Sequence, residues 1–527
     1  MTPTDFLLAP LRRVRRWILR PLDARITALT AENRALRASL EQVRAGLDEG
    51  LGTLGRTGIA LRRHELAGEP AERSDATGRR QATEQDVSVS VVIVTYNRAD
   101  ALAEVLTLLR AQDHPTFEVV VVNGPSSDGT ATILADKAPD AKVVDCPEKN
   151  IAAARNLGLA AAGGDVVAFL DDDTLPEPAW LGGLIGALVR RPVAGVGGPY
   201  RRRSGIALEH LHLVGDRLGE TQRIDDHDPT EWYSNPWSDR FVILPGGNSA
   251  YRRDALIEVG GFDEAFEYGG EEGDLGIRLR SAGHLIAETL EPVVYHQALA
   301  NEDRDAGATV LSRYRFLRSK AYFARKHGLA VLGPEAVDAS DRRSIEEYRV
   351  ERLKAIAEGR LDPTSIERYE DEARRAIADA TDLWAGGPRV HDAAWFAERR
   401  SEYRPFRSRP GDPTKAHMCT VSVGGGGIDA SLVTELRAAA ADGHVARVIT
   451  LDSERRISSE AGVWRHAVPA APTSRGAGDA ADPLGDELAR IHARRPVTEV
   501  IVVAGRGDAA GPRLPEGVPV RRSAHSA

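Results

Sequence analysis

Three consecutive aspartates, Asp171, Asp172 and Asp173, follow directly on an apolar run at 166–170. A buried strand that ends in carboxylates is a poor core segment, because each ionised carboxylate is costly to bury unless it is paired. The same arrangement suits a divalent cation, since hard cations prefer carboxylate oxygens and leave room for substrate phosphates. The triplet alone leaves open a solvated loop whose acids cap the next helix.

The triplet ends one of several expected strands that alternate with helices. The pattern predicts strands at 89–94, 117–122, 143–144 and 165–170, and helices at 99–112 and 150–162. Such alternation predicts an α/β fold with a parallel, doubly wound sheet. Ligands bind such sheets outside the carboxyl ends of the strands, so we expect Thr95, Asn123 and the triplet to meet in one crevice.

This region resembles the family 2 glycosyltransferases of the GT-A fold, a Rossmann-like fold for nucleotide-diphospho-sugars. The matching segments are VSVVIVTYNR (89–98), VVVNGPSSDGT (120–130), NIAAARNLGLAAAGGDVVAFLDDD (150–173), PGGNSAYRRDAL (245–256), GGFDEAF (260–266) and GGEEGDLGIRLRSAGH (269–284). They occur in the family's order within residues 87–300. A DxD-like triplet alone is common by chance, whereas this ordered set is specific.

The resemblance implies that the nucleotide base lies against the turn after the first strand, formed by Thr95, Tyr96, Asn97 and Arg98. At the end of the second strand the family usually has an aspartate that accepts a hydrogen bond from the base. This chain has Asn123 there, whose amide oxygen can still accept that bond, although without charge. An Asx turn is a compatible role for Asn123.

The resemblance gives each aspartate of the triplet a task. Asp171 would accept a hydrogen bond from the ribose, and Asp172 would orient its neighbours. Asp173 would bind Mg²⁺ or Mn²⁺, which bridges the diphosphate and neutralises charge on the leaving group. Asp171 and His296 are the further metal ligands expected, although a lone histidine is more often structural. The other donor-site residues that the family pattern implies are Asp128, Arg155, Gly247 and Asn248.

A second acidic cluster, Glu271, Glu272 and Asp274, supplies the acceptor side in this resemblance. Inverting transfer needs a general base within hydrogen-bond reach of the acceptor hydroxyl. Glu272 takes the place of the family's catalytic aspartate, and Asp274 is the alternative base. Acids near a helix N-terminus are also favoured by the helix dipole, so capping stays open for all three. The segment 245–249 would face donor sugar and acceptor, or would form only a glycine-rich turn into a helix.

The N-terminal residues 1–20 contain a basic amphipathic segment at 5–20, with Trp17 among arginines. Such a segment favours contact with a membrane surface. A solvated basic lead-in to the next helix is the alternative.

Apolar residues at heptad spacing predict a coiled coil over 21–56. Asn33 falls at a core position, where a single buried asparagine favours a parallel dimer, so we predict a homodimer through residues 19–54. Gly-, Pro- and charge-rich residues 57–86 predict a flexible linker, which argues against a helix packed on its own domain.

After the expected glycosyltransferase domain at 87–330, charged helical patterns predict a helical linker region over 331–414. Strand and helix patterns return over 415–510, where a glycine run resembles the start of a GT-B amino-terminal domain. Too few residues remain for the second Rossmann domain of a GT-B enzyme, so we expect a truncated, partial Rossmann-like unit. Residues 511–527 are expected to be a tail.

The bulk composition narrows the possible partners and location. A net charge of −9 over 527 residues gives no case for nucleic-acid binding. Neither a membrane-spanning apolar run nor a secretory leader is indicated, and Cys146 and Cys419 form no metal or disulfide pattern. We expect a cytoplasmic protein, held at the inner face of the plasma membrane if residues 5–20 contact it.

Two functions follow from these features. The first is an inverting, metal-dependent transfer of a sugar from a nucleotide-diphosphate donor to a hydroxyl of a glycan or lipid-linked acceptor, in cell-surface polysaccharide synthesis. The alternative is a non-catalytic coiled-coil scaffold that binds a nucleotide or glycan, motivated by the departures at Asn123 and Glu272.

Overall fold

The computed structural model divides the chain into two compact units, residues 1–62 and 63–527. The structure describes residues 87–202, 204–205, 208–209, 211–224, 240–305, 309–406, 417–423, 430–441, 444–452, 456–469, 483–494, 497, 499–504, 514, 516 and 518–524. The predicted basic segment, coiled coil, dimer contact and linker therefore lie outside the described residues. Among the described helices, none combines the length and apolar character that crossing a membrane requires.

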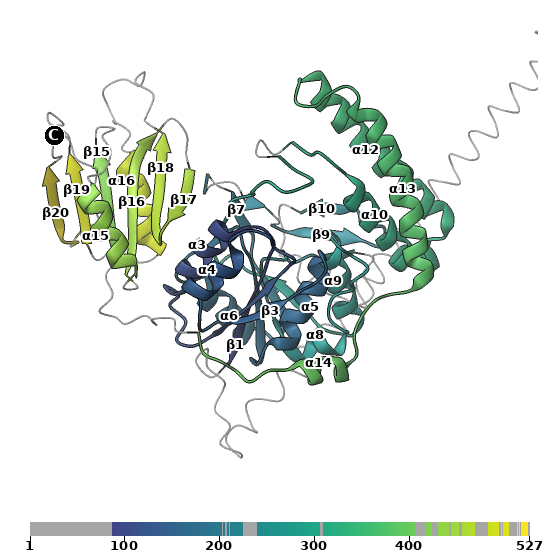
Figure 1. Cartoon of the computed structure of the whole chain (residues 1–527), viewed down its shortest axis with the longest axis horizontal. Coiled ribbons are helices and arrows are strands. Elements are labelled where there is room, and N and C mark those ends of the chain that lie inside the picture. The colour runs from purple at the N-terminus through teal and green to yellow at the C-terminus, as the bar shows by residue number, and fades with distance from the viewer. Residues whose placement is uncertain are drawn as a thin grey trace, which may run out of the picture. The chain divides into compact units, whose positions relative to one another are not determined.

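A seven-stranded sheet lies at the centre of the first domain (Figure 1), in the order β13-β6-β12-β4-β1-β2-β3. Its strands are β1 (Val89–Thr95), β2 (Glu118–Asn123), β3 (Lys142–Asp145), β4 (Val166–Asp171), β6 (Gly195–Gly197), β12 (Asn248–Arg252) and β13 (Ile286–Glu288). The four predicted strands are confirmed, and β1 pairs in parallel with β2 and β4. The sheet is mostly parallel, as predicted, but it contains one antiparallel strand, β12, between β4 and β6.

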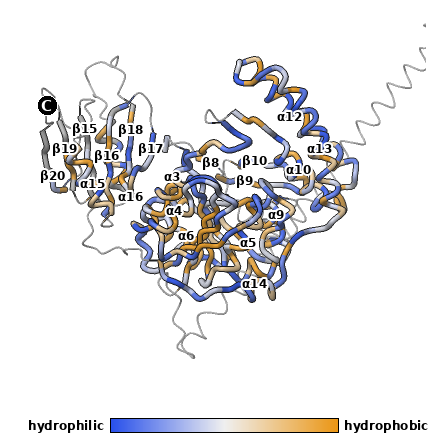
Figure 2. Tube along the Cα trace, in the orientation of Figure 1, coloured by the Kyte–Doolittle hydropathy of each residue, from blue (hydrophilic) through white to orange (hydrophobic). Residues whose placement is uncertain are grey.

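Helices cover both faces of this sheet, as the double winding predicts. They are α3 (Ala99–Leu109), α4 (Thr130–Lys137), α5 (Ile151–Ala161), α6 (Trp180–Arg190), α8 (Arg253–Glu258) and α9 (Glu271–Ser281). Successive residues of β1 point into different cores. Val91 packs in one apolar cluster with α3 and α6, and Val92 packs in the other with α5 and α8. Figure 2 shows the resulting concentration of apolar residues in the interior of the domain.

Gly158 lets α5 approach the sheet closely, because a Cβ atom there would lie closer than 3.0 Å to the side chain of Val92. The segment 245–249 does not lead straight into a helix. Strand β12 intervenes, since residues 248–252 pair with β4 before α8 begins.

A small four-stranded sheet brings distant residues to the end of β4. Its order is β5-β14-β7-β8, from β5 (Thr174–Pro176), β14 (Val294–His296), β7 (Tyr200–Arg202) and β8 (Leu208–Glu209). His296 lies opposite Thr174 in this sheet, which places the histidine beside the aspartate triplet. A three-stranded sheet is formed by β10 (Thr221–Arg223), β9 (Leu213–Asp216) and β11 (Arg240–Val242).

The helical region contains α10 (Tyr314–Phe323), the π-helix η2 (Ala324–Gly328), α11 (Leu329–Leu332), α12 (Pro334–Ala357), α13 (Ser365–Gly386) and α14 (Ala393–Arg399). Helices α12 and α13 form the long hairpin seen in Figure 1. Leu317 of α10 packs with Tyr369 and Ala373 of α13, and Phe396 of α14 enters the core beside α5. The predicted linker helices are therefore packed on the domain.

The C-terminal part forms a six-stranded sheet in the order β17-β18-β16-β15-β19-β20. Its elements are β15 (His417–Val423), α15 (Ala430–Ala441), β16 (Val445–Asp452), β17 (Arg456–Glu460), β18 (Val463–Pro469), α16 (Pro483–Arg494), β19 (Glu499–Ala504) and β20 (Val520–Ala524). The expectation of a tail over residues 511–527 is wrong where strand β20 forms. Its sequence, VRRSA, has no apolar run, and it forms a strand by pairing in parallel with β19.

Candidate active site

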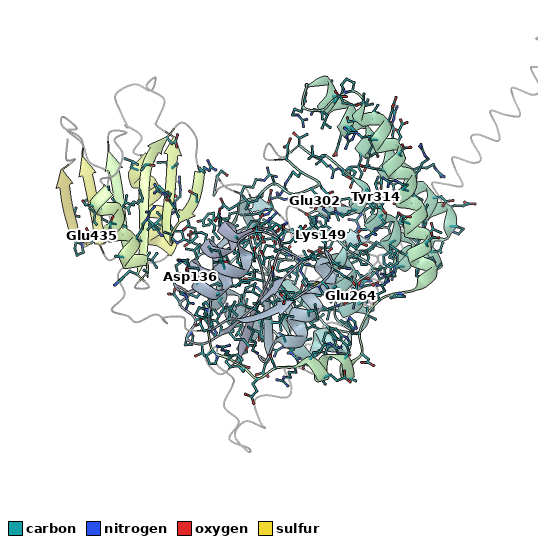
Figure 3. All side chains as sticks on the ribbon, viewed as in Figure 1. Asp136, Lys149, Glu264, Glu302, Tyr314 and Glu435 are labelled. Atoms are coloured by element: carbon teal, nitrogen blue, oxygen red, sulfur yellow. The ribbon has the colours of Figure 1, made fainter. Side chains whose placement is uncertain are left out.

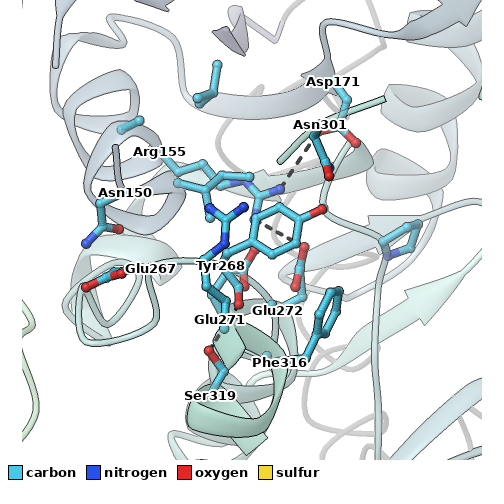
Figure 4. A pocket seen from close by; sticks show the side chains of 18 of the residues that line it. Asn150, Arg155, Asp171, Glu267, Tyr268, Glu271, Glu272, Asn301, Phe316 and Ser319 are labelled. Carbon is cyan, nitrogen blue, oxygen red and sulfur yellow. Dashed lines mark hydrogen bonds and ion pairs between the residues drawn. The ribbon is translucent and has the colours of Figure 1, made fainter. Parts of the chain in front are cut away.

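The carboxyl ends of β1 and β4 open onto a cavity of about 1130 Å³. An ion pair between Lys149 and Glu302 lies in its lining (Figure 3), and Lys149 Nζ lies 4.7 Å from the centre of the Tyr96 ring. Ten of the predicted site residues line the cavity: Thr95, Tyr96, Asn97, Arg98, Arg155, Asp171, Asp172, Asp173, Glu272 and His296. Figure 4 shows how Arg155, Asp171, Glu271 and Glu272 converge there.

Asp172 is committed to internal contacts. Its Oδ2 accepts a hydrogen bond of 2.8 Å from Thr95 Oγ1, and its Oδ1 accepts one of 2.9 Å from Arg98 Nη1. Burial raises the pKa of Asp172 to about 7, although Arg98 acts in the opposite direction. Both carboxylate oxygens are therefore engaged within the protein.

Asp171 is held from the other side by Tyr200. The Tyr200 hydroxyl donates a 3.0 Å hydrogen bond to Asp171 Oδ2 and accepts one of 2.6 Å from the Gly247 N–H. A Cβ atom at Gly247 would lie closer than 3.0 Å to the Asp171 carboxylate, so any side chain there would displace that carboxylate. Tyr200 was not predicted, because the sequence around it, GVGGPY, contains no motif that marks a functional tyrosine.

Asp173 lies between a cation and a histidine. Its Oδ2 is 2.9 Å from Arg98 Nη1 and accepts a 3.1 Å hydrogen bond from the Leu299 N–H, whereas its Oδ1 is 3.6 Å from His296 Nε2. The other ring nitrogen, Nδ1, lies 3.2 Å from Glu209 Oε2. Burial opposes protonation of this imidazole, but Glu209 and the aspartates outweigh it and raise the pKa of His296.

The donor atoms at the triplet suit a divalent cation in chemical type. Asp173 Oδ1 and Asp171 Oδ1 accept no hydrogen bond from another described residue at this cavity, and His296 Nε2 lies beside the former. Within the described part of the chain, however, no three His, Cys, Asp or Glu side chains are arranged to hold a metal ion as they stand. Carboxylate oxygens and an imidazole nitrogen are ligands that Mn²⁺ accepts. The residues therefore fit the predicted cation in donor type, although not in their present arrangement.

Arg155 joins the aspartate triplet to the second acidic cluster (Figure 4). Its Nη1 lies 2.9 Å from Glu271 Oε1 and 3.2 Å from Glu272 Oε1, and its Nη2 lies 3.9 Å from Asp171 Oδ1. The Arg155 side chain is only 4% exposed. A Cβ atom at Gly246 would lie closer than 3.0 Å to both Arg155 and Glu272, so a side chain at this position would have to displace the ends of one or both.

The two glutamates differ in access. Glu271 is 2% exposed, and burial, together with Glu272, raises the pKa of Glu271 to about 8. The Glu272 side chain is 23% exposed and lines the cavity. Glu271 also lies in the lining, but of the two carboxyl groups that of Glu272 is the more exposed.

Asp274 faces away from this chemistry. It is fully buried and is not part of the cavity lining. Arg278 Nε lies 2.7 Å from Asp274 Oδ2, and Lys326 Nζ and His327 Nε2 lie 2.5 and 2.8 Å from Oδ1. Arg278, the hydrogen bond from His327, and Lys326 together outweigh burial and hold the pKa of Asp274 well below its usual range. A carboxylate in this setting belongs to a structural ion-pair network.

Four other predicted site residues do not line this cavity. Asp128 caps turns, accepting from the Ala99 N–H at 3.0 Å and the Thr130 N–H at 3.1 Å. Asn248 is fully buried and bonded to Trp180 at 2.8 Å. Gly247 contributes its N–H to Tyr200. Asn123 lies beside Thr95 in the sheet, and its buried Oδ1 has no hydrogen-bond partner in the described structure.

The far end of the cavity is lined by aromatic rings and charged side chains of α10 and of the loop before α9. Tyr268 and Phe316 meet edge to face at 5.5 Å, and the Arg315 guanidinium lies 4.8 Å from the centre of the Tyr268 ring. Lys320 pairs with Glu220 at 2.8 Å. Aromatic rings and charged groups thus lie together in this part of the lining.

Comparison with known proteins agrees with this architecture. Residues 90–260 match the sequence model of the family described as "Glycosyl transferase family 2". This part of the chain is a family 2 glycosyltransferase domain. The match covers β1 to α8, including the triplet, Arg155 and Gly246.

Two curated proteins and one solved structure illustrate what the domain is similar to. A chondroitin synthase from Escherichia coli is 29% identical over 272 residues, which cover 45% of this chain and 39% of the synthase. A glucosyl-dolichyl phosphate glucuronosyltransferase from Haloferax volcanii is 28% identical over 292 residues, covering 52% of this chain and 88% of that protein. A mannosyltransferase from Pyrobaculum calidifontis, solved with GDP-Man and Mn²⁺, is 18% identical, with coverage of 64% and 99% and a TM-score of 0.34. The chain thus spans less than half of the chondroitin synthase.

Proposed function

We propose that this protein is an inverting, metal-dependent glycosyltransferase that moves a sugar from a nucleotide-diphosphate donor to an acceptor hydroxyl. The observation that carries the proposal is the position of Arg155, buried between Asp171 on one wall of the cavity and Glu272 on the other. One wall offers donors for a cation and a nucleotide. The opposite wall offers the partly exposed carboxylate of Glu272, which suits a general base.

In this mechanism Glu272 removes the proton from the acceptor hydroxyl as its oxygen attacks the anomeric carbon of the donor sugar. The bond between that carbon and the diphosphate oxygen breaks, and its electron pair leaves with the nucleotide diphosphate. Attack from the face opposite the diphosphate inverts the anomeric centre. Asp173, Asp171 and His296 would hold Mg²⁺ or Mn²⁺, which when bound neutralises charge on the leaving group. Arg155 holds Glu272 in place.

The acceptor we propose is a glycan or a lipid-linked saccharide in cell-surface polysaccharide synthesis. The chondroitin synthase supports a glycan acceptor, and the glucuronosyltransferase, named for a glucosyl-dolichyl phosphate, supports a lipid-linked one. The aromatic lining formed by Tyr268 and Phe316 supports both, since sugar rings pack on aromatic faces.

The N-terminal residues would place this activity in the cell. We propose that residues 19–54 form a parallel homodimer and that residues 5–20 contact the inner face of the plasma membrane from the cytoplasm. Deleting residues 1–60 is then expected to give monomers in sedimentation velocity. Flotation of a 1–60 peptide with anionic liposomes tests the membrane contact separately.

The activity is tested by incubating the full chain with a panel of UDP- and GDP-sugars, with Mn²⁺ or with EDTA, and measuring nucleotide release. Metal-dependent release from at least one donor, lost in Glu272→Gln when acceptor is present, is the expected result. Calorimetric donor binding without hydrolysis or transfer for any sugar nucleotide would support the non-catalytic scaffold instead.

A further inference from the structure

The guanidinium group of Arg98 lies between two carboxylates of the triplet. Arg98 Nη1 is 2.9 Å from Asp172 Oδ1 and 2.9 Å from Asp173 Oδ2. Both aspartates are 5% exposed, so the pairs lie in a medium of lower dielectric than water, where charges interact more strongly than at a surface. The triplet therefore has a counter-ion supplied by the chain itself.

The two ion pairs of Arg98 are not equivalent. Asp172 also accepts from Thr95 Oγ1 at 2.8 Å, so both of its oxygens are bound within the protein and it anchors Arg98. Asp173 keeps one oxygen, Oδ1, beside His296 at 3.6 Å. Asp173 is the residue at which Arg98 and an incoming cation would meet.

We propose that Arg98 is an exchangeable counter-ion: it neutralises Asp173 when no metal is bound and gives up Asp173, but not Asp172, when a divalent cation binds. The inference rests on the proposed function, because it takes Asp173 as a metal ligand. Its physical basis is repulsion, since a guanidinium and a divalent cation cannot both lie against one buried carboxylate without a cost to metal affinity.

Arg98 has room for this movement. Its side chain is 21% exposed, whereas the Arg155 side chain is 4% exposed and is bound to the two glutamates. Arg98 also lines a second cavity of about 650 Å³, whose lining includes Asp100 and Asp128. A guanidinium that turns from Asp173 toward this cavity stays near acidic groups and can remain bonded to Asp172.

The test measures Mn²⁺ binding to the nucleotide-free full chain by electron paramagnetic resonance of the unbound ion. Arg98→Met is expected to bind Mn²⁺ about tenfold more tightly than the wild type, because the competing charge is removed. Arg190→Met is the matched control: it removes the same charge from an exposed pair with Glu291, outside the cavity lining, and should bind like the wild type. Arg98→Lys keeps a positive charge on a shorter side chain, so its affinity for Mn²⁺ should lie between those of the wild type and Arg98→Met.

Equal or weaker Mn²⁺ binding by Arg98→Met would overturn the inference, and Mn²⁺ binding by the wild type would then leave the metal-dependent function standing. Failure of both proteins to bind Mn²⁺, with and without UDP or GDP, would overturn the inference and the metal site together. Thermal unfolding checks that each variant is folded. If Arg98→Met does not fold, Arg98→Gln replaces it, with the same expected tightening.

Discussion

The hydroxyl group of Tyr200 donates a hydrogen bond of 3.0 Å to Asp171 Oδ2, which connects β7 to the carboxyl end of β4. The hydroxyl oxygen of Tyr200 in turn accepts a hydrogen bond of 2.6 Å from the Gly247 N–H. One buried phenol thus fixes a carboxylate of the triplet and the glycine-rich turn before β12. The first contact acts directly on Asp171, a predicted metal ligand, and the second holds Tyr200 in place for it.

We expect Tyr200→Phe to raise the KM for the sugar-nucleotide donor and to lower the free energy of unfolding. The Gly247 N–H, buried in this bond, would lose its acceptor, and an unsatisfied buried donor costs about 1–3 kcal/mol. The free energy of unfolding in urea should fall by that amount. In steady-state kinetics the KM for the donor should rise, because Asp171 is no longer oriented. An unchanged donor KM in a variant of normal stability would show that this hydrogen bond does not position the donor.

The candidate bases can be separated by charge-neutral substitutions. Glu272→Gln should lower kcat by about 10²–10⁴-fold, the usual contribution of a general base, and leave calorimetric binding of the donor nucleotide intact. Asp274→Asn should act on folding instead, since it takes the carboxylate charge from Arg278, Lys326 and His327, and breaking a buried pair costs about 3–5 kcal/mol. A stable, inactive Asp274→Asn would reverse the assignment.

The pH dependence of stability should carry the signature of Glu271. Its pKa is raised from 4.5 to about 8 by burial and by Glu272. Between these values the native state keeps a proton that the unfolded chain releases, so the free energy of unfolding falls as pH rises through this window. Glu271→Gln, which keeps a neutral side chain of similar shape, should flatten that fall. Calorimetric Tm values of both proteins across the window provide the measurement, and parallel curves would contradict it.

Sequence reasoning located the elements whose signal is local. The run at 166–170 followed by three aspartates predicted β4 and its acidic end, because apolar strands and carboxylate clusters are visible without a partner. The antiparallel direction of β12 was not visible, since its five residues lie between a glycine turn and a short helix. Strand β20 was missed for a related reason, as its arginine-containing sequence forms a strand only against β19.

The candidate site shows the same division between features that the local sequence predicts and features that depend on tertiary structure. The motif spacing brought Arg155, the triplet and Glu272 to one cavity, but it left Asp274 open as the alternative to Glu272. Only burial and the surrounding cations distinguish the two. Tyr200 could not be found at all, because its role depends on a small sheet assembled from four distant segments. Tertiary pairing, rather than residue type, decides such roles.

Gly246 offers the sharpest test of the link between the two walls of the cavity. In Gly246→Ala the new Cβ atom would lie closer than 3.0 Å to Arg155 and to Glu272, so the methyl group must push the guanidinium and the carboxylate apart. Arg155 is buried and tied to Glu271, which makes displacement of the more exposed Glu272 the easier response. We expect kcat to fall by about tenfold or more, as for a misplaced general base, while nucleotide binding measured by calorimetry changes little.

Gly182→Ala is the control: it lies in α6 with no atom within 4 Å of its added Cβ, and it should raise the free energy of unfolding by about 0.4–1 kcal/mol without changing activity. If Gly246→Ala transfers sugar at the wild-type rate, Glu272 does not depend on its contact with Arg155, and the proposed coupling between the donor and acceptor walls is wrong.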